Sequence, residues 1–121
     1  MQKPIVLHVV RAIEDVLEIL KSHKGLRGVV FHGFVGSWQQ AKRCIEQGYY
    51  LSFGTRSLRS PKTREVIEKI PHTQLFCETD AEEHKGNIEQ IYSEVAAIRG
   101  VSIEALGYSI EENYNRLFGN G

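Results

Sequence analysis

The chain has 121 residues, of which 41% are hydrophobic and 25% are charged, values typical of one soluble globular domain. The 15 Lys and Arg residues balance the 15 Asp and Glu residues, so no bulk charge draws the chain to nucleic acid or to a membrane surface. No apolar run approaches the ~18 residues of a membrane span. Two cysteines are too few for a disulfide framework, so we expect a cytoplasmic protein in which Cys44 and Cys77 are small buried hydrophobes.

Strand and helix patterns alternate along the chain. Runs of β-branched and aromatic residues predict strands, and apolar residues at three- and four-residue spacing predict helices. Residues 55–60 are polar and predict a loop, while Pro61 is suited to the first turn of the helix that follows. Predicted strands cover residues 5–10, 28–34, 49–53 and 74–79, and predicted helices cover residues 12–23, 38–47, 61–70, 87–99 and 102–118.

Several of these helices carry recognisable end signals. Ser37 and Ser102 precede helical patterns and are predicted N-caps, and Gly48 is suited to the position just after a helix. Alternating strands and helices favour an α/β fold with a parallel sheet and right-handed crossovers. Four such strand–helix units plus a terminal helix amount to half of a (β/α)₈ TIM-type barrel, which needs about 250 residues.

Three acid-or-base side chains stand where predicted strands end: His8, His32 and Asp80. Parallel α/β folds place their chemistry at the carboxyl ends of strands, and imidazole with carboxylate is a ligand set for divalent metals. A lone strand histidine is more often structural, but two at matching positions of successive strands favour a metal site. Asp80 has the alternative of capping the short turn that follows it.

Side-chain alternation predicts which residues share a face. If His8 points to the interior of a barrel, the same phase turns polar or small side chains inward at the ends of all four strands. These inward residues are His8, His32, Ser52, Gly54, Glu78 and Asp80. Apolar residues on the same face, among them Val6, Val30 and Phe76, lie deeper in the predicted interior.

Glu78 lies two residues before Asp80 and is a candidate to orient a ligand histidine through a hydrogen bond. The alternative is a buried carboxylate paired with a neighbouring Arg or Lys. The turn at residues 33–37 contains two glycines, and its backbone N–H groups could hold an anion or simply form a tight turn.

Other residues near strand ends are weaker candidates for contact with a substrate. Arg11 and Arg56 could neutralise a phosphate, although surface arginines are usually just solvated. Trp38 could stack on a base or sugar, or it could fix its helix to the sheet. The segment 56–64 is the best candidate for a local basic groove, with Arg56, Arg59, Lys62 and Arg64.

Six segments together resemble the TatD-related metal-dependent deoxyribonucleases, in order and spacing. They are KPIVLH at 3–8, VFHGFVGS at 30–37, GYYLSFG at 48–54, LFCETD at 75–80, EN at 112–113 and RLFG at 116–119. The resemblance implies a (β/α)₈ barrel with one or two divalent ions, Mg²⁺, Mn²⁺ or Zn²⁺, that hydrolyses phosphodiester bonds in DNA.

The resemblance also implies roles for individual residues. His8 and His32 look like the family's histidines at the ends of strands five and six, and Asp80 like its aspartate after strand eight. All three would be metal ligands, and Asp80 would also accept a proton from the attacking water. Glu78 matches the family's preceding glutamate.

The sequence departs from the family pattern in several places. It contains no His-x-His pair and no counterpart of the family's metal-bridging Glu, and Val9, Val10, Gly33 and Glu82 replace usual family residues. We therefore expect residues 1–121 to be a single partial domain, the C-terminal half of the barrel, with weak or no hydrolysis alone.

Two other functions remain open. The first is an inactive half-barrel that self-associates through its open edges, as a homo-oligomer, or pairs with a complementary half. The second is a related amidohydrolase that cleaves a small ester or amide.

Overall fold

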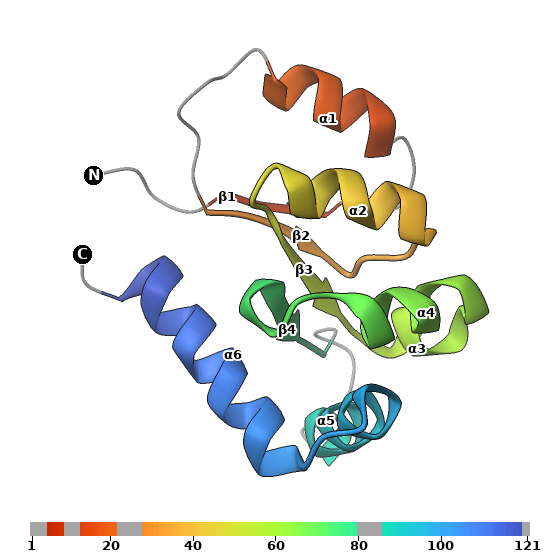
Figure 1. Ribbon diagram of the computed structural model, residues 1–121, viewed down its shortest axis with the longest axis vertical. Coiled ribbons are helices and arrows are strands. Elements are labelled where there is room, and N and C mark those ends of the chain that lie inside the picture. The colour runs from red at the N-terminus through yellow and green to blue at the C-terminus, as the bar shows by residue number, and fades with distance from the viewer. Residues whose placement is uncertain (1–4, 9–12, 22–27, 80–85, 120–121) are drawn as a thin grey trace.

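The computed structural model describes residues 5–8, 13–21, 28–79 and 86–119. Its centre is a four-stranded parallel sheet in the order β1-β2-β3-β4, so each strand lies beside its neighbour in the chain (Figure 1). The strands are β1 (Ile5–His8), β2 (Val29–His32), β3 (Tyr50–Phe53) and β4 (Leu75–Cys77). The predicted parallel α/β fold is confirmed.

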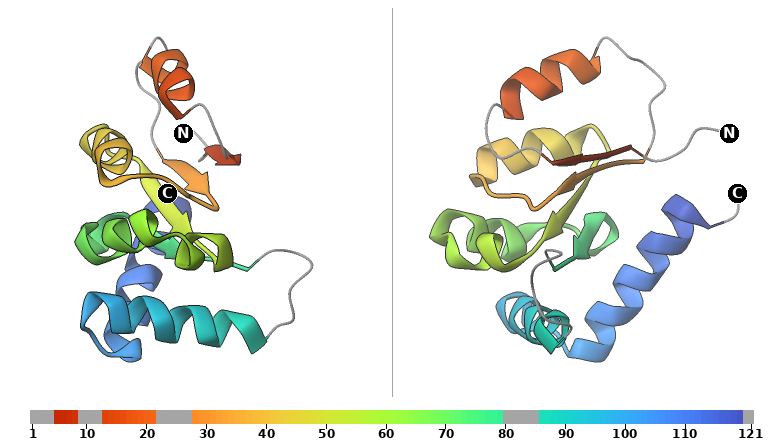
Figure 2. Two further views of the ribbon diagram at one scale, coloured as in Figure 1. Left: turned by 90° about the vertical axis from the view of Figure 1, so that its right-hand side faces the viewer. Right: turned by 180° about the vertical axis from the view of Figure 1, so that it is seen from behind.

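Helices connect the strands and close the described chain. They are α1 (Ile13–Lys21), α2 (Trp38–Glu46), α3 (Thr55–Arg59), α4 (Pro61–Lys69), the short 3-10 helix η1 (His72–Gln74), α5 (Gly86–Arg99) and α6 (Ile103–Phe118). Figure 2 shows α2 and α4 along the same side of the sheet, with the strand arrows running in a common direction. Within the described segments, every helix is too short or too polar to span a bilayer.

The main hydrophobic core lies between the sheet and these helices. Alternate strand residues, Val29, Phe31, Leu51, Phe53 and Leu75, pack there against apolar side chains of all the longer helices. Strand residues of the opposite phase form a second face. On that face the Tyr50 and Phe76 rings lie 5.5 Å apart, and Phe76 lies 6.5 Å from Phe118 of α6. The predicted alternation is thus confirmed for β2, β3 and β4.

The end signals of the helices are formed as predicted. Ser37 Oγ accepts the Gln40 N–H at 3.3 Å and Gln40 Oε1 accepts the Ser37 N–H at 3.0 Å, a reciprocal cap. Gly48 has a φ of 81°, the left-handed conformation that ends many helices. Ser102 Oγ accepts the Ala105 N–H at 3.0 Å.

One predicted element is wrong: residues 55–60 are not a loop, because Thr55–Arg59 form helix α3. The Leu58 N–H donates to the Gly54 carbonyl, and Ser57 Oγ accepts the Gly54 N–H, so a side chain completes the first turn. Polar composition hid this short helix, since Ser and Thr compete for backbone groups in loops and helix ends alike.

Strands β2, β3 and β4 are also shorter than predicted. Strand β4 begins at Leu75 because Gln74 belongs to η1, and its pairing ends at Cys77. Helix α6 is fixed at the beginning of β4 by a buried amide: Asn113 Nδ2 donates to the carbonyls of His72 at 2.8 Å and Leu75 at 2.9 Å. The candidate site lies at the opposite ends of the strands, where β2 and β4 end in polar residues.

Candidate active site

His32 and Glu78 meet at the carboxyl edge of the sheet, at 3.0 Å between Nε2 and Oε2. The Glu78 side chain is 10% exposed and the His32 side chain 33% exposed, so the imidazole is the more open partner. Because an ionised carboxylate only accepts hydrogen bonds, the proton in this contact belongs to His32 Nε2. In the neutral imidazole, Nδ1 then carries the lone pair that can bind a metal.

The two residues come from strands that are not neighbours, because β3 lies between β2 and β4. The small residue Gly54, directly after this intervening strand, makes room for the contact. A Cβ added to Gly54 would lie 3.2 Å from Glu78 Cγ and 3.3 Å from the Glu78 carbonyl oxygen. Glycine at this position therefore allows Glu78 to lie against the backbone and reach His32.

The turn that follows β2 supplies the second partner of Glu78. Gly33 has a φ of 64°, and its N–H donates to Glu78 Oε1 at 2.8 Å. Each carboxylate oxygen of Glu78 thus has its own donor. Among the described residues no Arg or Lys forms an ion pair with Glu78, and an imidazole and a backbone amide bind its oxygens, so the alternative of an Arg or Lys partner is not favoured.

Other amides of this turn also donate within the protein. The Phe34 N–H donates to the Ser52 carbonyl at 2.9 Å, the Gly36 N–H to Thr63 Oγ1 at 3.0 Å, and the Ser37 N–H to Gln40 Oε1. These bonds occupy the donors that a free anion would need, and they favour the tight-turn interpretation of residues 33–37. The carboxylate bound here is the protein's own Glu78.

Two fully buried hydroxyl groups fix this turn to the following helices. Ser57 Oγ donates to the Phe34 carbonyl at 2.7 Å and accepts the Gly54 N–H at 3.1 Å. Thr63 Oγ1 is close to both backbone groups of Gly36, at 3.0 Å from N and 3.2 Å from O. Ser57 therefore joins the two backbone segments, 33–34 and 54, that enclose Glu78.

Of the other predicted ligands, only the backbone position of His8 is described. His8 pairs in register with His32, so their α-carbons lie side by side at the carboxyl ends of β1 and β2. Asp80 and Arg11 lie outside the described residues. Among the described residues, no group of three His, Cys, Asp or Glu side chains is arranged to hold a metal ion.

Two predicted substrate contacts lie on helices. Trp38 is half-buried at the start of α2, and Lys69 Nζ of α4 lies 5.5 Å from the centroid of its ring. These contacts favour the interpretation in which Trp38 packs helices together. Arg56 is exposed on α3, two residues after Gly54.

Sequence reasoning missed Ser57 and Thr63 and gave Gly33 no individual role. The signal for Ser57 was present in the short spacing from Gly54, since Ser three residues after a strand-ending Gly can close a helical turn. The hydrogen bond between Thr63 and Gly36 joins residues 27 positions apart, and no local sequence pattern predicts it.

Comparisons with known proteins agree with this architecture. A family model described as TatD related DNase matches residues 1–119. The metal-dependent hydrolase YabD of Bacillus subtilis is 30% identical over 130 residues, which cover 95% of this chain and 51% of YabD. The deoxyribonuclease Tat-D of Schizosaccharomyces pombe is 37% identical over 83 residues, covering 66% of this chain and 26% of Tat-D.

A solved structure shows the same fold. The TatD homologue YjjV of Escherichia coli K12 superposes with a TM-score of 0.85 at 30% identity, covering 98% of this chain and 51% of YjjV. The chain spans about half the length of YabD and of YjjV. The ordered match of nearly the whole chain shows that it belongs to the TatD related DNase family.

Proposed function

We propose that the chain carries part of the active site of a divalent-metal-dependent phosphodiesterase that acts on DNA. The observation that carries this proposal is the His32–Glu78 pair at the carboxyl edge of a parallel sheet. Family membership supports it, and so do the names of the relatives, which include metal-dependent hydrolases and a deoxyribonuclease.

His32, held by Glu78, is suited to be one ligand of a divalent ion. A carboxylate that holds one imidazole nitrogen as N–H fixes the tautomer of the ring, the usual arrangement behind a metal-binding histidine. His32 would bind the ion, with His8 and Asp80 as further ligands, and Glu78 would position His32. A bound ion would supply Lewis-acid activation of the phosphoryl group.

The other residues have separate proposed tasks. Asp80 would accept a proton from the attacking water, since a carboxylate beside the reacting phosphate is a suitable base. Arg11 and Arg56 would contact substrate phosphates. A contact between Trp38 and the substrate stays a prediction. The position of Lys69 over the Trp38 ring does not favour it.

Hydrolysis assays test this function directly. The chain would be supplied with Mn²⁺, Mg²⁺ or Zn²⁺ and given bis(p-nitrophenyl) phosphate and end-labelled DNA. We expect weak metal-dependent hydrolysis by this chain, because it carries only part of the site, and we expect Asp80→Ala to abolish it. Equal activity of the Asp80→Ala variant would rule out the proposed roles of that residue.

The alternative function is association without efficient hydrolysis, and one observation favours it. Strands β1 and β4 are the edges of the sheet, and the Val6 side chain on β1 is 54% exposed, whereas its register partner Val30 is 5% exposed. We propose that residues 1–121 form half of a (β/α)₈ barrel whose open edge pairs with a second copy or a complementary half.

Light scattering after size-exclusion chromatography tests the association. We expect the mass of two chains for the wild type and of one chain for Val6→Lys, because a charge on an edge strand opposes pairing. Gln39→Lys is the matched control, since Gln39 is exposed on α2, the helix that connects the two central strands β2 and β3. A stable metal-loaded monomer would contradict association.

A further inference from the structure

The chain carries a row of exposed cations directly beyond the end of β3. Residues 55–64 contain four basic side chains and no acidic one, although the whole chain is neutral. Arg64 has a structural task, because its Nη1 donates to the Leu58 carbonyl at the end of α3 at 3.0 Å. Arg56, Arg59 and Lys62 remain, and we name these three the basic ridge.

The basic ridge has no evident role in stability. All three side chains are exposed, and among the described residues none lies within ion-pair distance of a carboxylate. Lys62 also stands in the first turn of α4, and this turn contains no acidic residue. A cation there opposes the helix dipole, so Lys62 costs stability at this position instead of adding to it.

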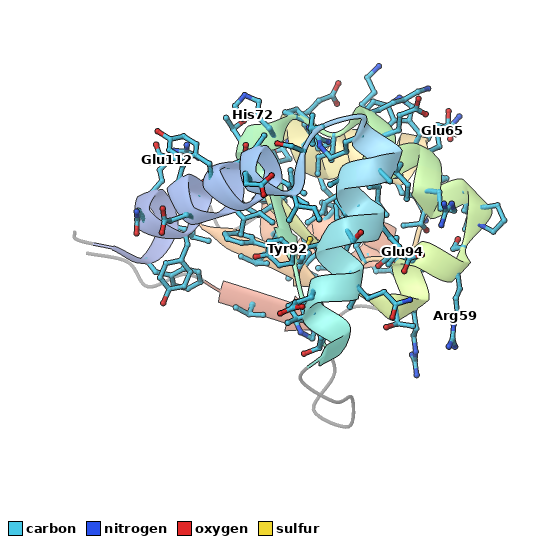
Figure 3. The ribbon with its side chains drawn as sticks, turned by 90° about the horizontal axis from the view of Figure 1, so that it is seen from below. Arg59, Glu65, His72, Tyr92, Glu94 and Glu112 are labelled. Atoms are coloured by element: carbon cyan, nitrogen blue, oxygen red, sulfur yellow. The ribbon has the colours of Figure 1, made fainter. Side chains whose placement is uncertain are left out.

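The location of the ridge connects it to the candidate active site. Gly54, the last residue before α3, lies against Glu78, so the ridge starts two residues beyond the wall of the site. Arg56 and Arg59 are separated by one helical turn, a rise of about 4.5 Å. Figure 3 shows Arg59 projecting outward from α3.

A hollow of about 300 Å³ adjoins the ridge between α3 and α5, lined by Thr55, Leu58, Arg59, Gln90, Ile91 and Glu94. Figure 3 shows Glu94 on α5 beside α3. Its carboxylate is the acidic group of the hollow, and it repels anions. Phosphates on the ridge would therefore follow its outer side, and Glu94 would weaken their binding.

We propose that the basic ridge binds the phosphate backbone of a single-stranded segment of the substrate beyond the bond that is cut. This inference rests on the proposed function, which it extends from the reacting phosphate to its neighbours. Single strands suit the ridge because it offers cations without a groove that would require a duplex. Binding should therefore depend on salt and little on sequence.

Fluorescence anisotropy with a short labelled oligo(dT), in EDTA so that no cleavage occurs, measures this binding. Three phosphate contacts predict a slope of log K against log salt of about −2, since each contact on a single strand contributes about −0.7. Arg59→Gln and Lys62→Gln should each reduce the slope by about 0.7 and weaken binding. Glu94→Gln should strengthen oligo(dT) binding, because it removes a negative charge beside the ridge. Its effect on affinity is therefore opposite to that of the two ridge variants.

Lys42→Gln is the matched control, because Lys42 is an exposed cation on α2, outside the ridge. Its slope should equal that of the wild type. Three results would contradict binding of single strands by the ridge. They are salt-independent binding, no oligo(dT) binding by the wild type, and equal losses of affinity in Lys42→Gln and Arg59→Gln.

Failure of the ridge and failure of the proposed function give different results. Hydrolysis of bis(p-nitrophenyl) phosphate without oligo(dT) binding would overturn the ridge alone. Ridge-dependent binding without hydrolysis of either substrate would support the ridge and contradict the phosphodiesterase.

Discussion

Glu78 organises the candidate site at the scale of a single residue. Its carboxylate has one donor for each oxygen, His32 Nε2 and the Gly33 N–H, and it is mostly shielded from solvent. Hydrogen bonds to charged groups contribute about 1.5–3 kcal/mol, more than neutral ones, when both partners are held in place. The pair therefore both stabilises the turn after β2 and sets the orientation of the imidazole.

We predict that Glu78→Ala lowers the free energy of unfolding by about 1.5–3 kcal/mol, because it leaves the Gly33 N–H without its acceptor. Urea denaturation measures the loss, and the amide proton of Gly33 should move upfield in the ¹H–¹⁵N spectrum. Glu65→Ala is the control, since Glu65 forms an exposed pair with Lys69 that should contribute under about 1 kcal/mol. Equal losses in the two variants would contradict the role of Glu78.

The two cysteines make a prediction about pH. Burial raises the pKa of the Cys44 thiol and of the Cys77 thiol from 9.0 to about 12. A thiol whose pKa is raised on folding contributes stability that is full below pH 9, the unfolded value, and is lost as pH rises toward 12.

We therefore expect slow alkylation of both thiols by iodoacetamide at neutral pH and a fall in unfolding free energy above pH 9. Mass spectrometry and urea denaturation across this range are the two measurements. Rapid alkylation of the folded chain would show that the thiols are accessible and ionise readily.

At the scale of elements, the site depends on bonds between the turn after β2 and the helices that follow β3. Ser57 links the Phe34 carbonyl to the Gly54 N–H, and Thr63 holds Gly36. These contacts place Gly33 and Gly54 on two sides of Glu78. Helix α3 thus positions the site from a segment whose sequence predicts only a loop.

Ser57→Ala should cost about 1–3 kcal/mol, because two buried backbone groups lose their partner. Hydrogen exchange should increase at residues 33–37 and at Gly54 while α6 keeps its protection. Asn113→Ala is the matched variant, because it removes two buried hydrogen bonds at the beginning of β4. In that variant, hydrogen exchange should increase in α6 while residues 33–37 and Gly54 keep their protection. Uniform loss of protection in Ser57→Ala would indicate global destabilisation.

At the scale of the molecule, much of the fold follows from local patterns. Period-two strands, helical spacing, Ser37, Gly48 and Ser102 predict element order and the parallel sheet, and alternation places His32 and Glu78 on one face. The contacts that complete the site are different, since Ser57 to Phe34 and Gly33 to Glu78 join residues 23 and 45 positions apart. Such pairings depend on tertiary packing, which a single sequence does not encode locally.

The whole sheet brings together residues that the chain separates, and we propose that the carboxyl ends of its strands bind a divalent metal through His32. Isothermal titration of Mn²⁺ into the wild type and into His32→Ala measures this binding, with His72→Ala as the control on an exposed histidine of η1. We predict binding by the wild type and by His72→Ala and its loss in His32→Ala. Equal Mn²⁺ affinity in His32→Ala, or no Mn²⁺ binding by any of the three proteins, would contradict metal binding through His32.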